Sequence, residues 1–315
     1  MTAPSIPGLE NTDLSRQPRT RRVHTSAKTA LIGAALLLPN LVLLLVFTYR
    51  PLIDNIRLSF YNWNIASTRP ATFIGLDNYI EWVSKPESWQ IVWQTAVFTF
   101  FAVFGSMVLG LALALLLDKP LKGRNAVRSL IFAPYVISGA AIGVAFQFVF
   151  DPGYGLIQDL LGKVGLDSPA FYTSPGWAMF MITTTYIWKN LGYTFVIYLA
   201  ALQGLRKDLD EAAEIDRTPR ARKFWRVTLP QLRPTTFFLS ITVLLNSLQV
   251  FDIINVMTAG GPLGTSTTTL VYQVYQETFV NSRAGYGAAV ATIMFLAVLV
   301  ITVVQVRMQE KNNDR

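Results

Sequence analysis

The chain has 315 residues, of which 52% are hydrophobic and 15% are charged, and its formal net charge is +8. Soluble domains carry about 25% charged residues, and the apolar residues here gather in blocks of about 20, the length that spans a bilayer. The sequence has no cysteine and a single histidine, His24, in a polar segment, which argues against thiol, disulfide, metal or triad chemistry. Membrane topology explains the basic charge better than nucleic-acid binding does.

The first 29 residues are rich in Pro, Ser, Thr and Arg and show no apolar periodicity, which predicts a disordered tail. The apolar run that follows is too long for the h-region of a signal peptide and predicts a retained membrane span. Residues 30–307 are expected to form the membrane domain, and 308–315 a short C-terminal tail. The predicted fold class is an all-α integral membrane protein with six transmembrane helices, at residues 30–49, 91–117, 127–150, 177–202, 235–257 and 286–306.

Lysine and arginine are distributed unevenly between the two sides of these spans. Twenty of the 27 basic residues lie in the N-terminal tail, the second-to-third connection, the insert at 203–234 and the C-terminal end, and six lie in the other connections. Because basic loops stay in the cytoplasm, both termini and the insert are predicted to be cytoplasmic. The protein is therefore expected to be a multi-pass protein of the plasma (inner) membrane.

The opposite side carries two distinctive segments. Residues 50–90 contain several tryptophans and tyrosines, which suit a membrane interface. Residues 266–281 place Leu270, Val274 and Thr278 at helical spacing and predict a short amphipathic helix in or near the interface. No internal repeat is evident, so a secondary transporter built from inverted repeats gains no support.

The charged insert between the fourth and fifth spans predicts two short helices joined by a turn. Asp208 followed by Glu211 resembles a capping box and predicts a helix that ends near Ile215. Thr218 and Pro219 predict a second helix start, with a capping hydroxyl and a proline at the first helical position. Prolines 230 and 234 are expected to end that helix before the fifth span. A folded, basic insert of this kind suits the docking of a soluble partner.

Two short motifs in this insert resemble a known loop. Glu211-Ala212-Ala213, followed by Val227-Thr228-Leu229-Pro230, is similar to the EAA loop of permease subunits in binding-protein-dependent ABC importers. Arg217 stands where that loop has glycine. If the turn requires a positive φ, a residue other than glycine costs about 1 kcal/mol there.

The resemblance covers about residues 30–307 and extends to the sugar-importer branch, the relatives of the maltose permease. It is carried by Phe73-Ile-Gly-Leu-Asp-Asn-Tyr79, Leu199-Ala-Ala-Leu-Gln203, Phe251-Asp252 and Gly260-Gly261-Pro262. Ile187-Trp188-Lys189, Thr267–Tyr272 and Val303–Arg307 look closest to permeases of glycerol-3-phosphate and glycerophosphodiester importers. The resemblance implies a type I importer permease that carries half of an alternating-access pathway.

The resemblance also implies partners for the chain. These are a second similar permease, two cytoplasmic ATPase subunits and an extracytoplasmic substrate-binding protein, besides membrane lipid and a small-molecule substrate. The sequence itself has no Gly-x-x-x-x-Gly-Lys-Ser/Thr loop, so ATP and Mg²⁺ are expected on the ATPase subunits and no cofactor on this chain. No nucleic-acid partner, catalytic residue or metal site is expected.

Two groups of candidate site residues follow. The ATPase-coupling group is Glu211, Ala212, Ala213, Asp216, Arg217, Leu229 and Pro230. The second group consists of polar residues inside spans, which usually face a cavity or another polar group. These candidate pathway residues are Lys189, Asn190, Tyr193, Asn246, Gln249 and Asp252.

Structural roles compete with these functional ones. Glu211 also suits the first turn of a helix, Lys189 would also serve in a pair with Asp252 or a helix-end carbonyl, and polar residues of the fifth span would also serve in interhelical hydrogen bonds. Gly139 and Gly143 form a Gly-x-x-x-Gly pair that indicates helix packing. A neutral sugar or oligosaccharide as substrate, and a stand-alone channel or secondary transporter, stay open as alternatives. A membrane enzyme is the least favoured class of protein, because the chain has no cysteine, one histidine in its tail and few carboxylates within the spans.

Overall fold

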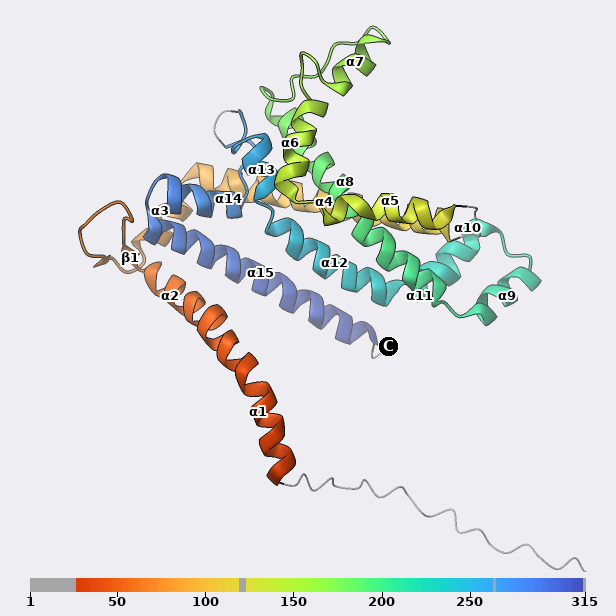
Figure 1. Cartoon of the computed structure of the whole chain (residues 1–315), viewed down its shortest axis with the longest axis horizontal. Coiled ribbons are helices and arrows are strands. Elements are labelled where there is room, and N and C mark those ends of the chain that lie inside the picture. Colours follow the sequence, from red (N-terminus) through yellow and green to blue (C-terminus); the bar gives the residue numbers. More distant parts are fainter. Residues whose placement is uncertain (1–26, 119–122, 263–264, 314–315) are drawn as a thin grey trace, which may run out of the picture. The chain divides into compact units, whose positions relative to one another are not determined.

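The computed structural model describes residues 27–118, 123–262 and 265–313, and the predicted tail 1–26 lies outside these ranges. The chain divides into two compact units, Met1–Ile53 and Asp54–Arg315 (Figure 1). The described part of the first unit is helical: α1 (Ala27–Leu44) continues through a π turn, η1 (Leu45–Tyr49), into α2 (Arg50–Leu58), whose last residues belong to the second unit. The apolar stretch Ala34–Leu58 is long enough to cross a membrane.

The helix of the first span continues past the predicted end at Tyr49 because a π turn accommodates a proline. Pro51 has no N–H and its ring would crowd the carbonyl four residues earlier. The π turn lies immediately before it, and the Arg50 N–H donates to Leu45 O, five residues back. The wider turn relieves the crowding, so the helix runs on to Leu58.

The second unit is almost entirely helical. A short hairpin, β1 (Tyr61–Asn62) with β2 (Thr72–Phe73), pairs antiparallel with Tyr61 opposite Phe73. The helices and π turns of the unit follow in chain order: α3 (Asp77–Ser84), α4 (Pro86–Leu117), α5 (Arg124–Val136), α6 (Gly139–Val149), α7 (Leu156–Gly162), α8 (Pro175–Gln203), α9 (Lys207–Ile215), α10 (Arg220–Lys223), η2 (Phe224–Thr228), α11 (Leu229–Gln231), α12 (Arg233–Leu248), α13 (Asp252–Met257), α14 (Leu270–Tyr275), η4 (Gln276–Val280) and α15 (Ala284–Asn313).

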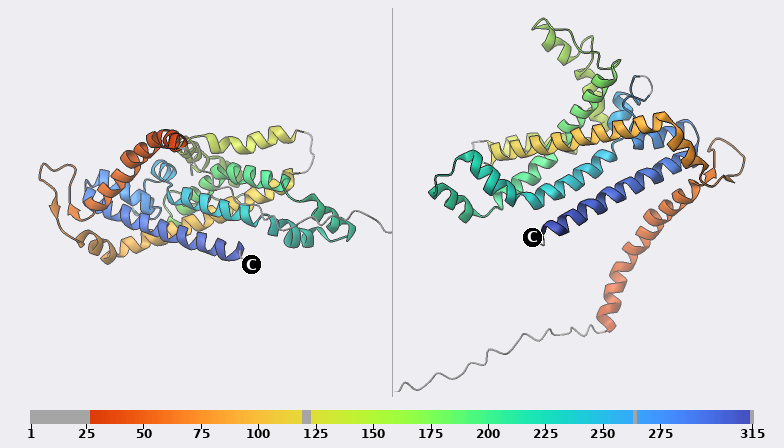
Figure 2. Two further views of the ribbon diagram at one scale, coloured as in Figure 1. Left: turned by 90° about the horizontal axis from the view of Figure 1, so that it is seen from below. Right: turned by 180° about the vertical axis from the view of Figure 1, so that it is seen from behind.

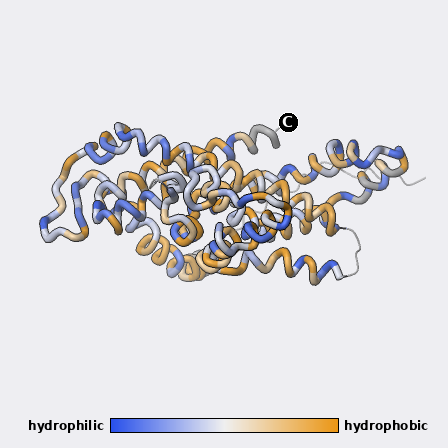
Figure 3. Tube along the Cα trace, turned by 90° about the horizontal axis from the view of Figure 1, so that it is seen from above, coloured by the Kyte–Doolittle hydropathy of each residue, from blue (hydrophilic) through white to orange (hydrophobic). Residues whose placement is uncertain are grey.

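The helices that are apolar and long enough to cross a membrane agree with most of the predicted spans. Among the described residues there are four such helices, Ala34–Leu58, Pro86–Leu117, Arg233–Met257 and Ala284–Met308, and the bent pair α5–α6 makes a fifth if it is one span. The fourth predicted span coincides with α8, which is long enough but less apolar because it carries Lys189, Asn190 and several threonines. Figure 3 shows orange, hydrophobic stretches along the helices and blue, hydrophilic ones toward the loops.

Two of the predicted spans contain a break in the helix. The third span bends by 103° between α5 and α6, where Ile137 is extended and Ser138 precedes the new helix. Pro134 lies just before this bend. The fifth span stops at Leu248 and restarts at Asp252. Hydropathy averages over such breaks, because the residues at them are mostly apolar.

The core of the second unit is built where α8 packs closely on α4 and α5. Gly110 of α4 lies against Thr194 of α8, and the Thr194 hydroxyl donates to Ser106 O at 2.7 Å. Gly192 of α8 lies so near α5 that an added Cβ would come within 2.5 Å of Ile131 O. Glycines at these positions therefore set the helix separation. Figure 2 shows α12 and α15 lying side by side, and α12 also contacts α4 and α8.

On the side away from the charged insert, α3, the hairpin and the segment before α15 form a compact cap. Glu81 accepts from Arg283 Nη2 at 2.6 and 2.7 Å and pairs with Lys85 at 2.6 Å. Both cations also lie over the ring of Tyr286, at 4.2 and 5.0 Å. Burial opposes ionisation of Glu81, but the hydrogen bonds from Arg283 and Lys85 outweigh it and lower the pKa of this carboxyl.

The segment predicted as an amphipathic helix at 266–281 is more buried than expected. It forms α14 and η4, and Thr269 caps α14 by accepting from Tyr272 N. Its first turns are buried, and Gln273 accepts from the Trp82 indole at 3.2 Å. Only the far end, with Phe279 and Val280, is exposed.

Candidate coupling loop and translocation pathway

The first half of the insert folds as α9 and ends in a Schellman motif. Arg217 has φ of +48°, the left-handed conformation that glycine normally supplies. The Thr218 N–H donates to Ala213 O at 2.9 Å, the six-to-one bond of that motif. The turn thus requires the conformation for which glycine is expected, and this chain adopts it with arginine.

The second half of the insert differs from the prediction at both ends. Pro219, rather than Thr218, is the residue before the helix, and no side chain caps α10. The helix does not end at Pro230 but continues to Gln231, since the π turn η2 precedes this proline as η1 precedes Pro51. Leu232 follows with φ −81° and ψ −4° and is fully buried, and α12 begins at the next residue.

The two ends of the insert are joined at its base. The Arg206 N–H donates to Gln231 Oε1 at 3.3 Å, and the Arg206 side chain pairs with Asp208 at 2.5 Å. The hydrogen bond from Arg206 lowers the pKa of Asp208. Asp208 therefore lies inside the first turn of α9 as an ion-pair partner and does not precede the helix as a cap. The loop is a closed two-helix projection.

The predicted coupling residues occupy different environments in this projection. Glu211 is exposed on α9, whereas Ala213 is buried, and the side chain of Ala212 lies outside the described part. Asp216 and Arg217 form the exposed turn, and Leu229 and Pro230 are half-buried in the second helix. Ile215 and Trp225 are exposed by 82% and 66%. Large apolar side chains exposed on both halves of the loop suit a protein-docking surface.

Lys189 lies half-buried on α8 and contacts α5. Its ammonium donates to Tyr135 O at 3.4 Å and lies 5.3 Å from the Tyr135 ring centroid. The same ring stacks on Tyr193, with centroids 5.2 Å apart and an interplanar angle of 21°. Within the described residues no ion pair joins Lys189 to Asp252, so the alternative of a carbonyl partner is the one observed.

Asp252 lies at the restart of the fifth span and packs against the bend of the third. Its Oδ1 accepts from Ile253 N at 2.9 Å, and its carboxylate lies so close to Gly139 that an added Cβ would overlap Oδ2. Gly139 thus has a packing role, as predicted, but its neighbour is a carboxylate. Lys189 contacts the bent span just before the bend and Asp252 just after it.

One further polar group near these residues was not singled out from the sequence. Tyr186 is almost fully buried, and its hydroxyl has no hydrogen-bond partner among the described residues. Its carbonyl accepts from Asn190 Nδ2 at 2.9 Å. Tyr186 precedes Lys189 by three positions on α8, so the helical spacing of Lys189 and Asn190 was a signal that could have found it.

The two remaining candidates, Asn246 and Gln249, are exposed at the end of α12, and their side-chain amides have no hydrogen-bond partner in the described part of the chain. Exposed amides within a span are unfavourable against lipid. They are therefore expected to face water or another polypeptide, in keeping with a pathway. The roles of all these candidate residues stay predictions.

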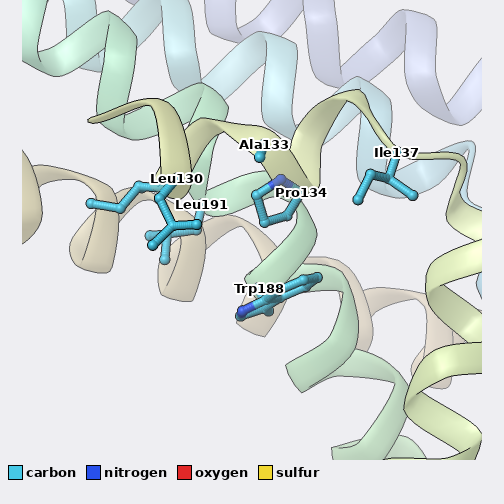
Figure 4. Close-up of a pocket in the computed structure, with 7 residues that line it drawn as sticks. Leu130, Ala133, Pro134, Ile137, Trp188 and Leu191 are labelled. Carbon is cyan, nitrogen blue, oxygen red and sulfur yellow. The ribbon is translucent and has the colours of Figure 1, made fainter. Parts of the chain in front are cut away.

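The apolar pocket between α5 and α8 is a different feature. It encloses about 410 Å³ and is lined by Leu130, Ile131, Ala133, Pro134, Ile137, Trp188 and Leu191 (Figure 4). Trp188 and Leu191 flank Lys189 in sequence, but no charged side chain lines the pocket. It does not have the donors that an anionic or hydroxylated solute needs.

Known proteins resemble this chain over most of its length. It is 35% identical over 277 residues to the sulfoquinovosyl glycerol transport system permease protein SmoG of Agrobacterium fabrum, covering 88% of this chain and 90% of that protein. It is 33% identical to the sn-glycerol-3-phosphate transport system permease protein UgpA of Pectobacterium atrosepticum (88% and 93% covered) and 34% identical to UgpA of Brucella abortus (88% and 94%).

The fold has a counterpart of known structure. The model superposes on a chain of a bacterial ABC transporter involved in the import of the acidic polysaccharide alginate, with a TM-score of 0.79 and 24% identity, covering 90% of this chain and 96% of that one. The shared helical fold confirms the predicted class, a type I importer permease.

The identity of 33–35% to these relatives over 88% of the chain shows a membrane subunit of an ABC importer of the sugar and glycerol-phosphate type. A model of the binding-protein-dependent transport system inner membrane component family matches residues 106–313, and the chain belongs to this family.

Proposed function

We propose that this chain forms half of the translocation pathway for glycerol-3-phosphate or a glycerophosphodiester in an ATP-driven, binding-protein-dependent importer. The similarity to the UgpA permeases carries this proposal, since it extends over 88% of the chain. A second similar permease forms the other half, and an extracytoplasmic binding protein delivers the ligand. The chain is a non-catalytic subunit, with its termini and the insert in the cytoplasm.

The closed projection formed by α9, α10 and α11 is the proposed contact with the ATPase subunits. ATP and Mg²⁺ bind to those subunits, and ATP-driven closure moves the projection. Exposed Glu211 is the central contact, supported by exposed Ile215 and Trp225 on the same loop. The projection is tied at its base by the Arg206–Gln231 hydrogen bond, so it moves as one body with the adjoining span.

The substrate path is proposed at the two helix breaks. Lys189 supplies a cation, because only part of its hydrogen-bonding capacity is used by Tyr135 O. Asn246 and Gln249 supply amide groups, and the break between Leu248 and Asp252 gives the fifth span a place to bend. Alternating access then needs rotation about these breaks and not the deformation of intact helices.

A second candidate substrate is a sulfonated glycoside such as sulfoquinovosyl glycerol. It is favoured by the 35% identity to SmoG. Both candidates join a glycerol unit to an anionic group, so the same cation at Lys189 serves either one. Neutral sugars would gain nothing from that charge.

Uptake into proteoliposomes that contain the whole complex and its binding protein tests the proposal. Glycerol-3-phosphate, glycerophosphocholine, sulfoquinovosyl glycerol and maltose would be compared as substrates and as stimulators of ATP hydrolysis. Stimulation by phosphate compounds supports the first candidate, and stimulation by the sulfonate alone supports the second. Stimulation by maltose alone would refute both and the role of Lys189.

A variant of Lys189 distinguishes a role of this side chain in the substrate pathway from a role in assembly of the complex. Lys189→Met is expected to lower uptake of an anionic substrate about tenfold while the complex still assembles, since one charge-assisted hydrogen bond contributes about 1.5 kcal/mol. Loss of assembly in Lys189→Met would instead identify the Tyr135 contact as structural.

A further inference from the structure

A second apolar groove lies between α4 and α12, with α8 at its floor. It encloses about 400 Å³ and is lined by Thr99, Phe100, Val103, Phe104, Met107, Val108, Leu111, Tyr198, Leu229, Thr236 and Leu244. Phe100 and Phe104 stack with an interplanar angle of 3° and are exposed by 62% and 58%. The groove is therefore open along an aromatic wall.

The dimensions of this groove fit one leaflet of a bilayer. Its lining on α4 runs from Thr99 to Leu111, about 18 Å of helix at 1.5 Å per residue. The hydrocarbon of one leaflet is about 15 Å deep. The lining residues from Phe104 to Leu111 lie in the half of the predicted span 91–117 that leads to the basic second-to-third connection. Those from Thr99 to Val103 lie beyond its midpoint, so the groove runs from the half on the basic side to past the middle of the span.

Two arginines flank the basic end of the groove. Arg233 and the lining residue Thr236 are three positions apart in α12, so they share a helix face, and Arg226 lies in the π turn η2, three residues before the lining residue Leu229. Both arginines are exposed, and neither has an ion pair or cation–π contact within the described part of the chain. The sequence contains no Asp or Glu between Asp216 and Asp252.

We propose that an anionic glycerophospholipid of the leaflet on this side occupies the groove. An acyl chain lies along Phe100 and Phe104, and the headgroup phosphate lies between Arg226 and Arg233, whose guanidinium groups bind phosphate in a fork. Two cations that lack an ion pair within the described residues, near one end of an apolar groove, favour this occupant over an apolar protein helix, which would leave the charges uncompensated.

The site does not depend on which solute the importer carries. Native mass spectrometry of the purified complex, titrated with phosphatidylglycerol or with phosphatidylcholine of the same acyl chains, tests it. We expect phosphatidylglycerol to bind more tightly. In Arg226→Gln/Arg233→Gln its apparent affinity should fall by about 30-fold, because each basic residue near an anionic headgroup contributes about fivefold.

Two comparisons make the test specific. The double variant Arg220→Gln/Arg222→Gln removes the same charge from the same loop, away from the groove, and should leave the preference intact. Val108→Trp fills the groove and should abolish retention of the diacyl lipid, and glycerol phosphate without acyl chains should not compete.

Equal retention of both lipids, or equal loss in the two double variants, would refute the site. A cysteine placed at Val108 is the only thiol in this chain, because the natural sequence has none. Its efficient crosslinking to a cysteine in a membrane helix would show that protein covers the groove and would overturn the proposal.

Discussion

Replacing Arg217 with glycine should stabilise the turn between the two helices of the coupling loop. Arg217 adopts φ of +48°, which costs an L-residue about 1 kcal/mol relative to glycine. The Schellman bond from the Thr218 N–H to Ala213 O reports on this turn directly. If its amide exchanges through local opening, Arg217→Gly should slow exchange at Thr218 about fivefold, because 1 kcal/mol corresponds to that factor at 25 °C.

Hydrogen–deuterium exchange of the intact complex measures this change, read from peptides that end before and after the turn. Arg222→Gly is the matched control, because it removes the same side chain from a position inside the helical run Arg220–Gln231. There glycine should speed exchange about fivefold, by the ordinary helix-propensity penalty. If Arg217→Gly also sped exchange, the arginine side chain would be stabilising the turn through a contact, and the argument from backbone strain would be refuted.

Three further predictions concern other parts of the chain. Glu211→Arg should abolish ATP-driven uptake while membrane insertion, followed by fractionation, is unchanged; retained uptake would favour a stand-alone carrier. Gly139→Ala should lower uptake at least tenfold without loss of assembly, because the added methyl displaces the neighbouring carboxylate; unchanged uptake would rule out a role for that contact. Glu81→Gln should destabilise the compact cap formed by α3, the hairpin and the segment before α15 by at most about 1 kcal/mol, since the pair with Arg283 is over a third exposed. The pKa of Glu81 is lowered in the fold, so this contribution is fully present above the ordinary carboxyl pKa and is lost as the pH falls through the lowered pKa of the folded state, which a series of thermal melts from pH 7 down to pH 2 would detect.

The sequence was sufficient for those parts of the fold that depend on local pattern. Apolar blocks located the long helices, and the motif around Glu211 located the two-helix loop. The unusual backbone at Arg217 was also foreseeable, because the loop pattern requires glycine there. In each case, neighbouring residues along the chain determine the outcome.

What could not be predicted depends on contacts between distant segments. The bend at Ile137 follows a proline and precedes a glycine, but hydropathy over this stretch is continuous, and only the packing of α6 against α13 makes the bend necessary. Lys189 binds a carbonyl 54 residues away, and no spacing rule identifies Tyr135 as its partner. Pro230 was read as a helix end because the compensating π turn has no sequence signature.

The buried position of Leu232 has a mechanical consequence. This residue joins two helical arms, Arg220–Gln231 on the loop side and α12 on the other, of about 18 Å and 24 Å at 1.5 Å per residue. With Leu232 anchored in the core, it acts as a fulcrum. A rigid rotation that shifts the loop tip by 1 Å would shift the far end of α12 by roughly 1.3 Å. That end is where the fifth span is interrupted, so a small displacement imposed on the loop arrives at the break without attenuation.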